Sequence, residues 1–281
     1  MKHNDANIKQ GGRNVVKWLS RGLYQIPDAF PHENPDIDSI AWQGHCLFAQ
    51  WTDHFDCGEE TQFWWVIKDT PFDLSALKAK RRYEITKGNK NFYVKRISPI
   101  GYLDALYDVY LESLKGYRHA VAEPRETFCK NMENLIDDKR FNLFAAFHRE
   151  SDLLCGFAMV FVNGRYIPIS SLKTRVSYEK ENVNFALVYG ILQYFELDLR
   201  AGSYLCDGSR TVMHETNFQP FLMKYFGFRK AYCDLHLTFR GVAKVAFYCM
   251  FPFRNVPILK KFSPKLYAVL KLLAWSKNLP R

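Results

Sequence analysis

The chain contains 281 residues, of which 48% are hydrophobic and 16% are aromatic, and this composition excludes an intrinsically disordered protein. Its formal net charge is +10, but residues 241–281 hold eight basic side chains and no acid, so the rest of the chain carries only +2. The seven cysteines show no paired spacing, the first residues are polar, and no window of about 18 residues is apolar throughout. We therefore expect a cytoplasmic protein with free thiols, no secretory signal and no membrane-spanning helix.

The first segment that we expect comprises residues 1–73. Residues 41–51 and 62–68 read as two strands, separated by a polar turn around Gly58. Zinc would accept His45, Cys46, His54 and Cys57, but the interval between Cys46 and His54 matches no common zinc motif. Strand geometry would also send His45 and Cys46 to opposite faces. We expect a small, mostly β segment here and no metal.

Residues 74–97 are strongly basic, with Glu84 as the only acid. The first half has helical spacing, whereas Gly88 and Asn89 interrupt the pattern before a predicted strand at Phe92–Val94. A basic helix that leads into an edge strand can hold a phosphate, a pyrophosphate or an RNA backbone. The alternative is a helix whose basic face lies in water. The basic residues between positions 78 and 96 are Lys78, Lys80, Arg81, Arg82, Lys87, Lys90, Lys95 and Arg96.

The middle of the chain predicts a complete α+β domain over residues 74–240. Helical spacing indicates helices over 102–117 and 125–136. Three strands follow, joined by short polar turns, and then a helix, a strand, a helix that stops at Gly227, and a last strand. This order predicts a mixed, mostly antiparallel sheet flanked by helices, and it excludes a doubly wound Rossmann fold. The later predicted elements are strands 142–149, 153–162 and 165–175, helix 184–200, strand 203–206, helix 217–225 and strand 231–239.

A polar turn follows the strand that ends at Cys206. It contains Asp207, Ser209 and Arg210, with His214 and Glu215 shortly after. Ligand sites of α/β-type sheets gather at such strand ends, and His214 could act as a general base whose pKa is adjusted by Glu215 or Asp207. We take Asp207, Ser209, His214 and Glu215 as candidate catalytic residues. The alternative is a turn that only caps the neighbouring helices.

Both the basic segment and the stretch CDGSRTVMHETNFQPFLMKYFGFRK at 206–230 resemble acyltransferases of the GNAT superfamily, in its FemAB-like branch. The resemblance extends over roughly residues 70–240. It implies two splayed central strands whose free backbone groups face an activated acyl donor, and it places them at 153–162 and 165–175. Donor-binding candidates are Ser170, Ser171, Lys173, Arg175 and Arg210. The serine hydroxyls could instead bond neighbouring carbonyls.

The expected glycine-containing pyrophosphate loop is missing, because no glycine occurs between Gly164 and Gly190. This departure puts acyl-CoA in doubt as the donor, while FemAB-like relatives that use aminoacyl-tRNA also lack a standard loop. The donor is thus an acyl-CoA, an acyl carrier protein or an aminoacyl-tRNA, and a tRNA would contact residues 78–96. No metal cofactor is implied.

Residues 241–281 form the last predicted segment, a basic tail rich in aromatic residues. Residues 264–276 have helical spacing, with lysines beside an apolar face. Such a helix suits an anionic membrane surface, or it docks on the protein's own core with its lysines in water.

Taken together, the sequence predicts an N-acyltransferase that moves an acyl or aminoacyl group to an amine of a sugar, amino acid or cell-envelope precursor. The acceptor would be a small molecule or be linked to a lipid, and the protein would lie in the cytoplasm, at the inner face of the membrane if the tail binds there. The alternative function is a non-catalytic module of GNAT ancestry that binds an anionic membrane or RNA.

Overall fold

The computed structural model describes residues 9–10, 13–14, 17–28, 30–31, 34–38, 40–115, 121–212 and 217–279. Its contacts group the chain into two compact units, and three chain segments contribute to the first of them. Unit 1 comprises Met1–Val66, Ser209–Thr216 and Lys230–Arg281, and unit 2 comprises Ile67–Gly208 and Asn217–Arg229. This grouping places the N-terminal segment and the C-terminal tail together. The division into a β segment at 1–73, a domain at 74–240 and a tail at 241–281 stays a prediction.

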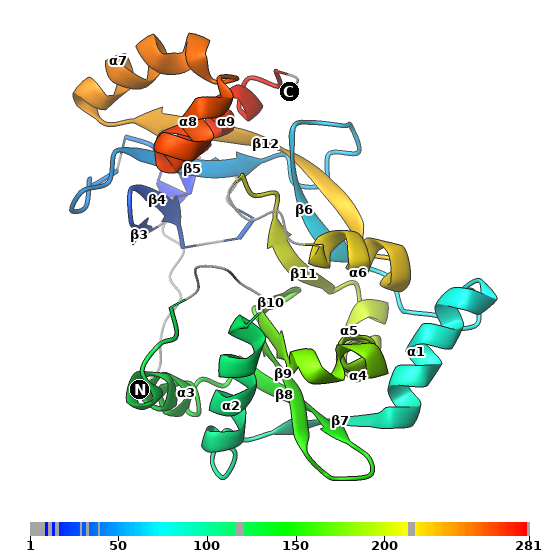
Figure 1. The fold of residues 1–281 in the computed structure, drawn as a ribbon. Helices are drawn as coiled ribbons and strands as arrows, with labels where there is room; N and C mark the ends of the chain where they lie inside the picture. Colours follow the sequence, from blue (N-terminus) through cyan, green and yellow to red (C-terminus); the bar gives the residue numbers. More distant parts are fainter. Residues whose placement is uncertain are drawn as a thin grey trace. The chain divides into compact units, whose positions relative to one another are not determined.

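Unit 2 carries most of the predicted α+β domain (Figure 1). Strands β7 to β10 are neighbours in chain order and pair antiparallel, and β11 joins β10 in parallel. The predicted fold class is therefore confirmed. The elements are α1 (Ala79–Asn91), β7 (Phe92–Ile97), α2 (Leu103–Leu114), α3 (Arg125–Asn134), β8 (Phe141–His148), β9 (Leu154–Phe161), β10 (Tyr166–Thr174), a 3-10 helix (Val176–Glu181), α4 (Val183–Tyr194), α5 (Glu196–Arg200), β11 (Tyr204–Ser209) and α6 (Phe218–Phe226).

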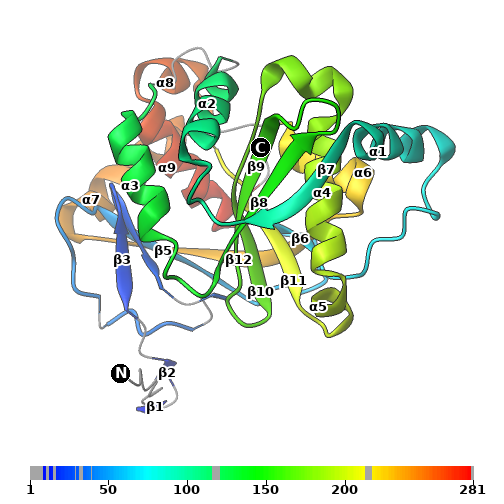
Figure 2. The same ribbon diagram turned by 90° about the horizontal axis from the view of Figure 1, so that it is seen from below.

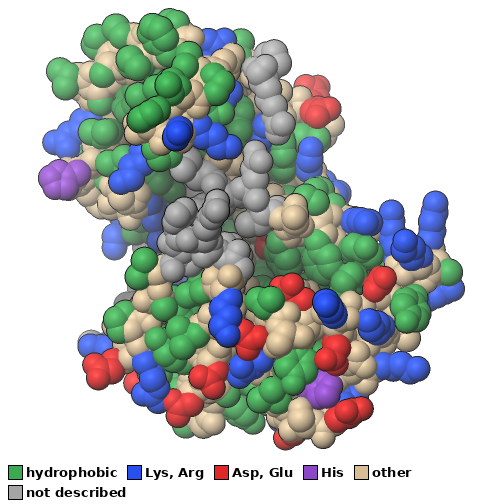
Figure 3. Space-filling model, viewed as in Figure 1, with side chains coloured by type: hydrophobic (Ala, Val, Ile, Leu, Met, Phe, Trp, Pro, Cys, Tyr) green, Lys and Arg blue, Asp and Glu red, His purple; other side chains and the backbone are tan. Residues whose placement is uncertain are grey.

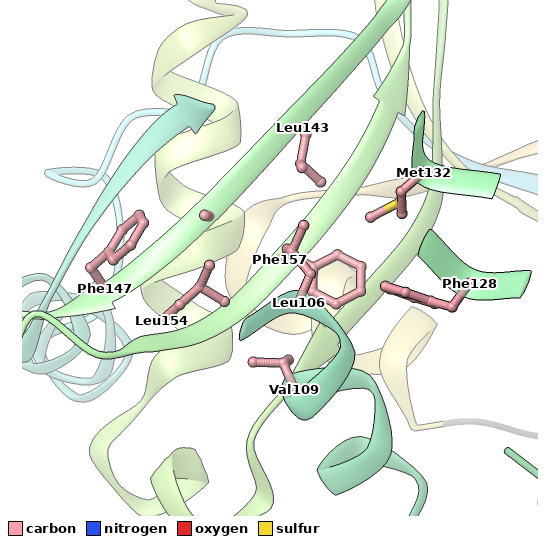
Figure 4. Close-up of a cluster of buried hydrophobic side chains, with 9 residues drawn as sticks. Leu106, Val109, Phe128, Met132, Leu143, Phe147, Leu154 and Phe157 are labelled. Atoms are coloured by element: carbon pink, nitrogen blue, oxygen red, sulfur yellow. The ribbon is translucent and has the colours of Figure 1, made fainter. Parts of the chain in front are cut away.

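The strands of unit 2 lie between two layers of helices, with α2 and α3 on one face and α1 and α4 on the other (Figure 2). Alternate residues of β8 and β9 point to the α2–α3 face, because side chains along a strand alternate. Leu143 and Phe157 pack there against Leu106 and Phe128 from the helices (Figure 4). On the opposite face Phe144 contacts Phe195 at the end of α4, with ring centroids 5.8 Å apart. Burial on both faces explains why the predicted strands here read as nearly continuous apolar runs.

The sequence predicts that the basic helix is interrupted at Gly88. In the structure Gly88 lies inside α1, which continues to Asn91. A Cβ at this position would lie 2.6 Å from the carbonyl oxygen of Asn182 and 3.1 Å from the backbone nitrogen of Ala186. Gly88 therefore permits α1 to approach the start of α4 backbone to backbone. The helix ends only where Phe92 takes the extended conformation of β7.

Replacing Gly88 by alanine should lower the free energy of unfolding by about 1–3 kcal/mol, because the added methyl group meets backbone atoms that cannot rotate away. Urea unfolding of the variant measures this loss. Alanine normally stabilises an exposed helix relative to glycine by about 1 kcal/mol, so a gain in stability would contradict the close approach of α1 and α4.

Unit 1 contains strands in the order β3-β4-β5-β12-β6 and the three C-terminal helices. Strands β3 and β4 were not predicted, because their polar and apolar residues do not alternate clearly. Part of β6 and Arg229 of β12 belong to unit 2. The elements are β1 (Lys9–Gln10), β2 (Arg13–Asn14), β3 (Trp18–Arg21), β4 (Tyr24–Pro27), β5 (Phe48–Asp53), β6 (Phe63–Lys68), β12 (Arg229–Phe239), α7 (Gly241–Met250), a 3-10 turn (Phe251–Phe253), α8 (Pro257–Phe262) and α9 (Pro264–Trp275).

The C-terminal helix α9 docks on the core of unit 1. Val269, Leu270 and Leu273 pack with Phe48 and Phe239 from the strands. Trp275, only 6% exposed, joins a second cluster with Phe63, Cys233 and Leu235. Of the two alternatives for the predicted tail helix, the structure therefore shows the one in which its apolar face covers the protein's own core. None of the helices in the described ranges is both long enough and apolar enough to cross a membrane.

Candidate active site at the divergence of β10 and β11

Strands β10 and β11 pair over only three residues. Tyr166, Ile167 and Pro168 lie opposite Tyr204, Leu205 and Cys206, and the parallel pairing stops there. Both strands continue, β10 to Thr174 and β11 to Ser209. Pro168 is the last β10 residue in the pairing, and proline has no N–H group to donate to a neighbouring strand. The two strands therefore diverge after Pro168 and Cys206.

The divergence lies one strand away from its predicted position. We expected the strands at 153–162 and 165–175 to separate, but Gly156–Val160 of β9 pairs with Ile169–Thr174 of β10. The pairing survives because a bulge between Ile169 and Ser171 absorbs the irregularity at Ser170. The predicted position is therefore wrong, and the neighbouring pair β10 and β11 supplies the splayed strands.

The backbone of Leu172 points away from β9. Arg175 N–H donates to the carbonyl of Cys155 at 2.8 Å, which marks the pair Arg175 and Cys155 as hydrogen-bonded. Since hydrogen-bonded and non-bonded pairs alternate along an antiparallel ladder, Lys173 and Ser171 also bond β9, whereas Leu172 and Thr174 direct their backbone groups to the other side. That side is where β11 has already diverged. Leu172 thus offers a backbone N–H at the edge where an activated carbonyl could bind.

Asp207 is the first residue of β11 beyond the pairing with β10. Burial raises the pKa of its carboxyl from 3.8 to about 7, even though a side-chain hydrogen bond with Gln219 acts in the opposite direction. Gln219 lies in the first turn of α6, which packs on α4 through Phe221 and Phe185, with ring centroids 4.8 Å apart. The helix pair thus fixes Gln219, and Gln219 orients Asp207. A carboxyl with this pKa exchanges a proton readily near neutral pH.

Tyr166 and Cys206 lie on the other face of the same strands. Their side chains are hydrogen-bonded to each other, and burial raises the pKa of the Tyr166 phenol and raises that of the Cys206 thiol to about 12. Both groups therefore stay protonated at neutral pH. The backbone N–H of Gly208 also donates to the Cys206 sulfur at 3.3 Å. A neutral, buried thiol of this kind supports the strand and is a poor nucleophile.

The predicted donor-binding residues on β10 separate into different environments. The Ser170 hydroxyl donates to the carbonyl of Met159 at 3.2 Å, which is the alternative that the sequence left open. Ser171 and Lys173 point to the α2–α3 face by strand alternation, whereas Asp207 shares the opposite face with Leu205 and Ile167. Partial burial lowers the pKa of Lys173. The structure therefore does not bring Lys173 and Ser171 to the face that carries Asp207.

Arg175 is engaged within unit 2. Its guanidinium donates to the carbonyl of Leu154 and to the Glu112 carboxylate, both at 3.0 Å. Glu112 in turn accepts from the backbone N–H of Ser177 at 3.0 Å, at the start of the 3-10 helix. The Arg175 and Glu112 side chains are only 14% and 16% exposed. This ion pair joins α2 to the end of β10. Because the Arg175 guanidinium is occupied by these contacts, the proposed donor site does not include it.

The remaining candidates lie in unit 1 or outside the described residues. Ser209 and Arg210 belong to unit 1. The Arg210 guanidinium lies 4.3 Å from the ring centre of Trp64 and 3.9 Å from that of Trp275, and it donates to the carbonyl of Gln62 at 2.5 Å. Arg210 therefore packs among the aromatics of unit 1. His214 and Glu215 fall outside the described residues, so their catalytic role stays a prediction.

The basic helix α1 presents part of its charge to water. Lys78, Lys80, Arg82 and Lys90 are exposed, whereas Lys87 donates to the carbonyl of Lys180 at 2.7 Å. In the following strand Lys95 and Arg96 are also exposed, and the Lys95 ammonium lies 4.6 Å from the ring centre of Phe147. Exposed cations therefore lie on α1, on the residue that precedes it and on β7. Over the described parts of the chain, no three His, Cys, Asp or Glu side chains gather as metal ligands would.

Sequence reasoning missed Gln219 and Leu172. Gln219 gave no signal beyond its place at the start of a predicted helix, and its contact with Asp207 depends on how α6 packs on α4. The proposed role of Leu172 depends on its backbone N–H group, and the type of side chain gives no sign of whether a backbone N–H is free. Pro168 was the available signal, because a proline inside a strand marks a position where a ladder ends.

No protein-family model matches this sequence, and no curated protein sequence shows significant similarity to it. Solved structures are similar in fold. The C-terminal domain of a lysylphosphatidylglycerol synthetase from Agrobacterium fabrum aligns with a TM-score of 0.52 at 12% identity, over 85% of each chain. The L-PGS of Bacillus licheniformis aligns with a TM-score of 0.50 at 13% identity, over 86% of this chain and 85% of that one. FemX aligns with a TM-score of 0.49 at 9% identity, over 67% of this chain and 64% of FemX.

At such low sequence identity, a structural alignment establishes a shared fold and does not establish a shared reaction. The chain therefore shares the fold of the lysylphosphatidylglycerol synthetase domain and of L-PGS, a mixed, mostly antiparallel sheet flanked by helices.

Proposed function

We propose that the protein is an acyl- or aminoacyltransferase whose reaction takes place where β10 and β11 diverge. The observation that carries the proposal is the position and pKa of Asp207. Its carboxyl follows the last paired residue of β11, and its pKa of about 7 suits a general base at neutral pH. Transfer to an amine needs such a base, because an ammonium group must lose a proton before its nitrogen can attack a carbonyl carbon.

In the proposed mechanism the donor carbonyl lies along the free edge of β10. The N–H of Leu172 donates to the carbonyl oxygen as negative charge develops on it. The Asp207 carboxylate, oriented by Gln219, accepts the proton of the acceptor amine. The new carbon–nitrogen bond forms, the bond to the leaving thiol or ribose hydroxyl breaks, and the proton finally passes to that leaving group.

The basic face of α1 favours aminoacyl-tRNA over acyl-CoA as the donor. Lys80 and Arg82 are exposed in unit 2, the unit that also contains Asp207 and Leu172. Several exposed cations along one helix suit the extended phosphate backbone of RNA. The acceptor we propose is an amine of a sugar, an amino acid or a cell-envelope precursor at the inner membrane face. The similar folds include a lysylphosphatidylglycerol synthetase domain, whose name indicates an aminoacyl group joined to a lipid, and this supports a lipid-linked acceptor.

A transfer assay with labelled donors tests the proposal. Purified protein is incubated with an acyl-CoA, an acyl carrier protein thioester or a mixed aminoacyl-tRNA pool, together with a panel of amine acceptors, and amide product is measured by mass spectrometry. We expect product from aminoacyl-tRNA, with a rate that falls steeply as salt rises. Absence of transfer from all three donors, with protein shown to be folded, would contradict the proposed function.

The Lys80→Gln and Arg82→Gln double variant distinguishes the donors. It should raise the KM for aminoacyl-tRNA about tenfold or more and leave kcat nearly unchanged, because each lost cation removes one phosphate contact. Lys260→Gln with Lys261→Gln, which removes the same charge from α8 in unit 1, is the matched control. An unchanged KM in the α1 variant would show that α1 is only a solvated helix.

A further inference from the structure

The helices α7 and α8 expose apolar side chains that the core of unit 1 leaves uncovered. α9 already buries its apolar face, and Phe247 of α7 is buried in the same cluster, with Ala243 and Met250 packed against it. Six of the seventeen large apolar side chains exposed in the described residues lie between positions 242 and 262. They are Val242 (88% exposed), Val245 (65%), Tyr248 (43%), Phe253 (51%), Ile258 (58%) and Phe262 (74%).

Exposed lysines lie on the same elements as these side chains or next to them in the chain. Lys244 lies on α7, Lys260 and Lys261 on α8, and Lys265 at the start of α9, and all four are exposed. Lys277 stays within 4.8 Å of the Tyr248 ring centre. Figure 3 shows hydrophobic side chains gathered over α7 and α8, with basic side chains beside them. We call the six apolar residues together with Lys244, Lys260, Lys261 and Lys265 the α7–α8 surface.

The charge of this surface decides which partner fits it. No acid occurs anywhere in residues 241–281, so α7, α8 and α9 carry basic side chains and no acidic ones. A second copy of the same surface would bring lysines against lysines, which like-charge repulsion disfavours. A nucleic acid would use the lysines but gain little from exposed valine, isoleucine and phenylalanine. An anionic bilayer accepts both, because apolar side chains enter the acyl boundary while lysines reach the headgroups.

We propose that the α7–α8 surface docks on anionic lipid membranes. The inference extends the proposed location at the inner membrane face and rests on that part of the proposed function. It assigns the contact to α7, the Phe251–Phe253 turn and α8, whereas the sequence pointed to the helix at 264–276, whose apolar face is buried. Phe253 and Phe262 enter the interface, and Lys260 and Lys261 bind lipid phosphates.

Vesicle flotation of the full chain, without donor or acceptor, tests this proposal. The vesicles contain either equimolar phosphatidylglycerol and phosphatidylcholine or phosphatidylcholine alone. We expect flotation only with the anionic vesicles. Val245→Glu with Phe262→Glu should weaken binding at least tenfold, because each change places a carboxylate where an apolar side chain entered the interface. Ile100→Glu with Leu197→Glu is the matched control, since these side chains are 65% and 78% exposed in unit 2.

Three outcomes would overturn the proposal: no flotation with anionic vesicles, equal flotation with neutral vesicles, or equal losses in the two double variants. Sedimentation velocity of the same proteins tests whether the α7–α8 surface binds a second copy of the chain instead. A dimer that Val245→Glu and Phe262→Glu convert to a monomer, with flotation unchanged, would assign the surface to self-association and would also overturn the proposal. Transfer to a water-soluble amine should survive in both double variants, so a failure of docking is distinguishable from a failure of the proposed reaction.

Discussion

Replacing Asp207 by asparagine should lower kcat/KM for transfer by about 10²–10³-fold, because a neutral amide cannot accept the proton of the attacking amine. The side chain keeps its size and its ability to bond Gln219, so the fold should be retained. Asp137→Asn, at an exposed position of unit 2, is the matched control and should leave kcat/KM unchanged. A variant at Asp207 that keeps more than about a third of the activity would remove this residue from the mechanism.

The pH dependence of the reaction gives an independent reading of Asp207. Its pKa of about 7 implies that kcat/KM falls tenfold per pH unit below about 7 and levels off above it. The acceptor amine also titrates and shapes the profile. Measuring the profile with a second amine of different pKa identifies the amine's contribution, because only that part of the profile shifts. In the Asp207→Asn variant, the remaining kcat/KM should no longer fall as pH drops below about 7. A fall that persists in the variant would belong to another group.

Asp207 should also affect stability, with a sign opposite to that of an ordinary surface carboxylate. Below pH 3.8 the carboxyl is protonated in the folded and unfolded states alike and has no effect. Between pH 3.8 and about 7 only the unfolded state ionises, so stability falls as pH rises, and above about 7 the full loss is present. Asp207→Asn should therefore raise Tm relative to wild type at pH 8 and not at pH 4.

The second large effect is expected at the ion pair of Arg175 and Glu112. Arg175→Met should lower the free energy of unfolding by about 2–4 kcal/mol, because it leaves the Glu112 carboxylate mostly buried beside Ser177 without its cation. Urea unfolding measures the loss. The KM for the donor should stay unchanged at a temperature where the variant is folded. A raised KM with unchanged stability would restore Arg175 to the donor site.

Glu112 predicts the pH at which this contribution disappears. Burial acts to raise its pKa, but hydrogen bonds from Ser177 and Arg175 outweigh burial and lower the pKa below 4.5. The stability gained from the ion pair is therefore complete above pH 4.5 and is lost as pH falls through the lowered pKa. The stability difference between wild type and Glu112→Gln should shrink in that acidic range. A difference that stays constant down to pH 3 would contradict the pairing.

The sequence predicted most elements of unit 2 because local signals define them, but it missed the 3-10 helix at Val176–Glu181 and read α4 and α5 as one helix over 184–200. The strands from Phe141 to Thr174 are bounded by short turns, and the turn at Gly164 has the positive φ that glycine allows. Gly88 misled the prediction, because the sequence alone does not distinguish a glycine that permits close helix packing from a glycine that ends a helix. In the tail, prolines such as Pro257 begin new helices, and α7 was not expected.

The candidate site was less predictable, because it depends on contacts between distant parts of the chain. Asp207 was selected for its place at a strand end, but its pKa follows from burial and from Gln219, which belongs to another element. The residue pairs that β10 forms with β9 and β11 decide where backbone groups are free, and no local pattern encodes both pairings. Arg175 looked available for an anion until the structure placed Glu112 beside it.

Hydrogen exchange measured by mass spectrometry tests the divergence of β10 and β11 most directly. The protein is compared with and without a non-reactive amide analogue of the acyl donor. The site described above predicts that peptides covering 169–175 and 204–209 gain protection on binding, while peptides covering 92–97 and 141–148, from the far strands of the same sheet, do not. Protection confined to those far strands, or no change at 169–175 with the analogue shown to be bound, would contradict a donor site at β10.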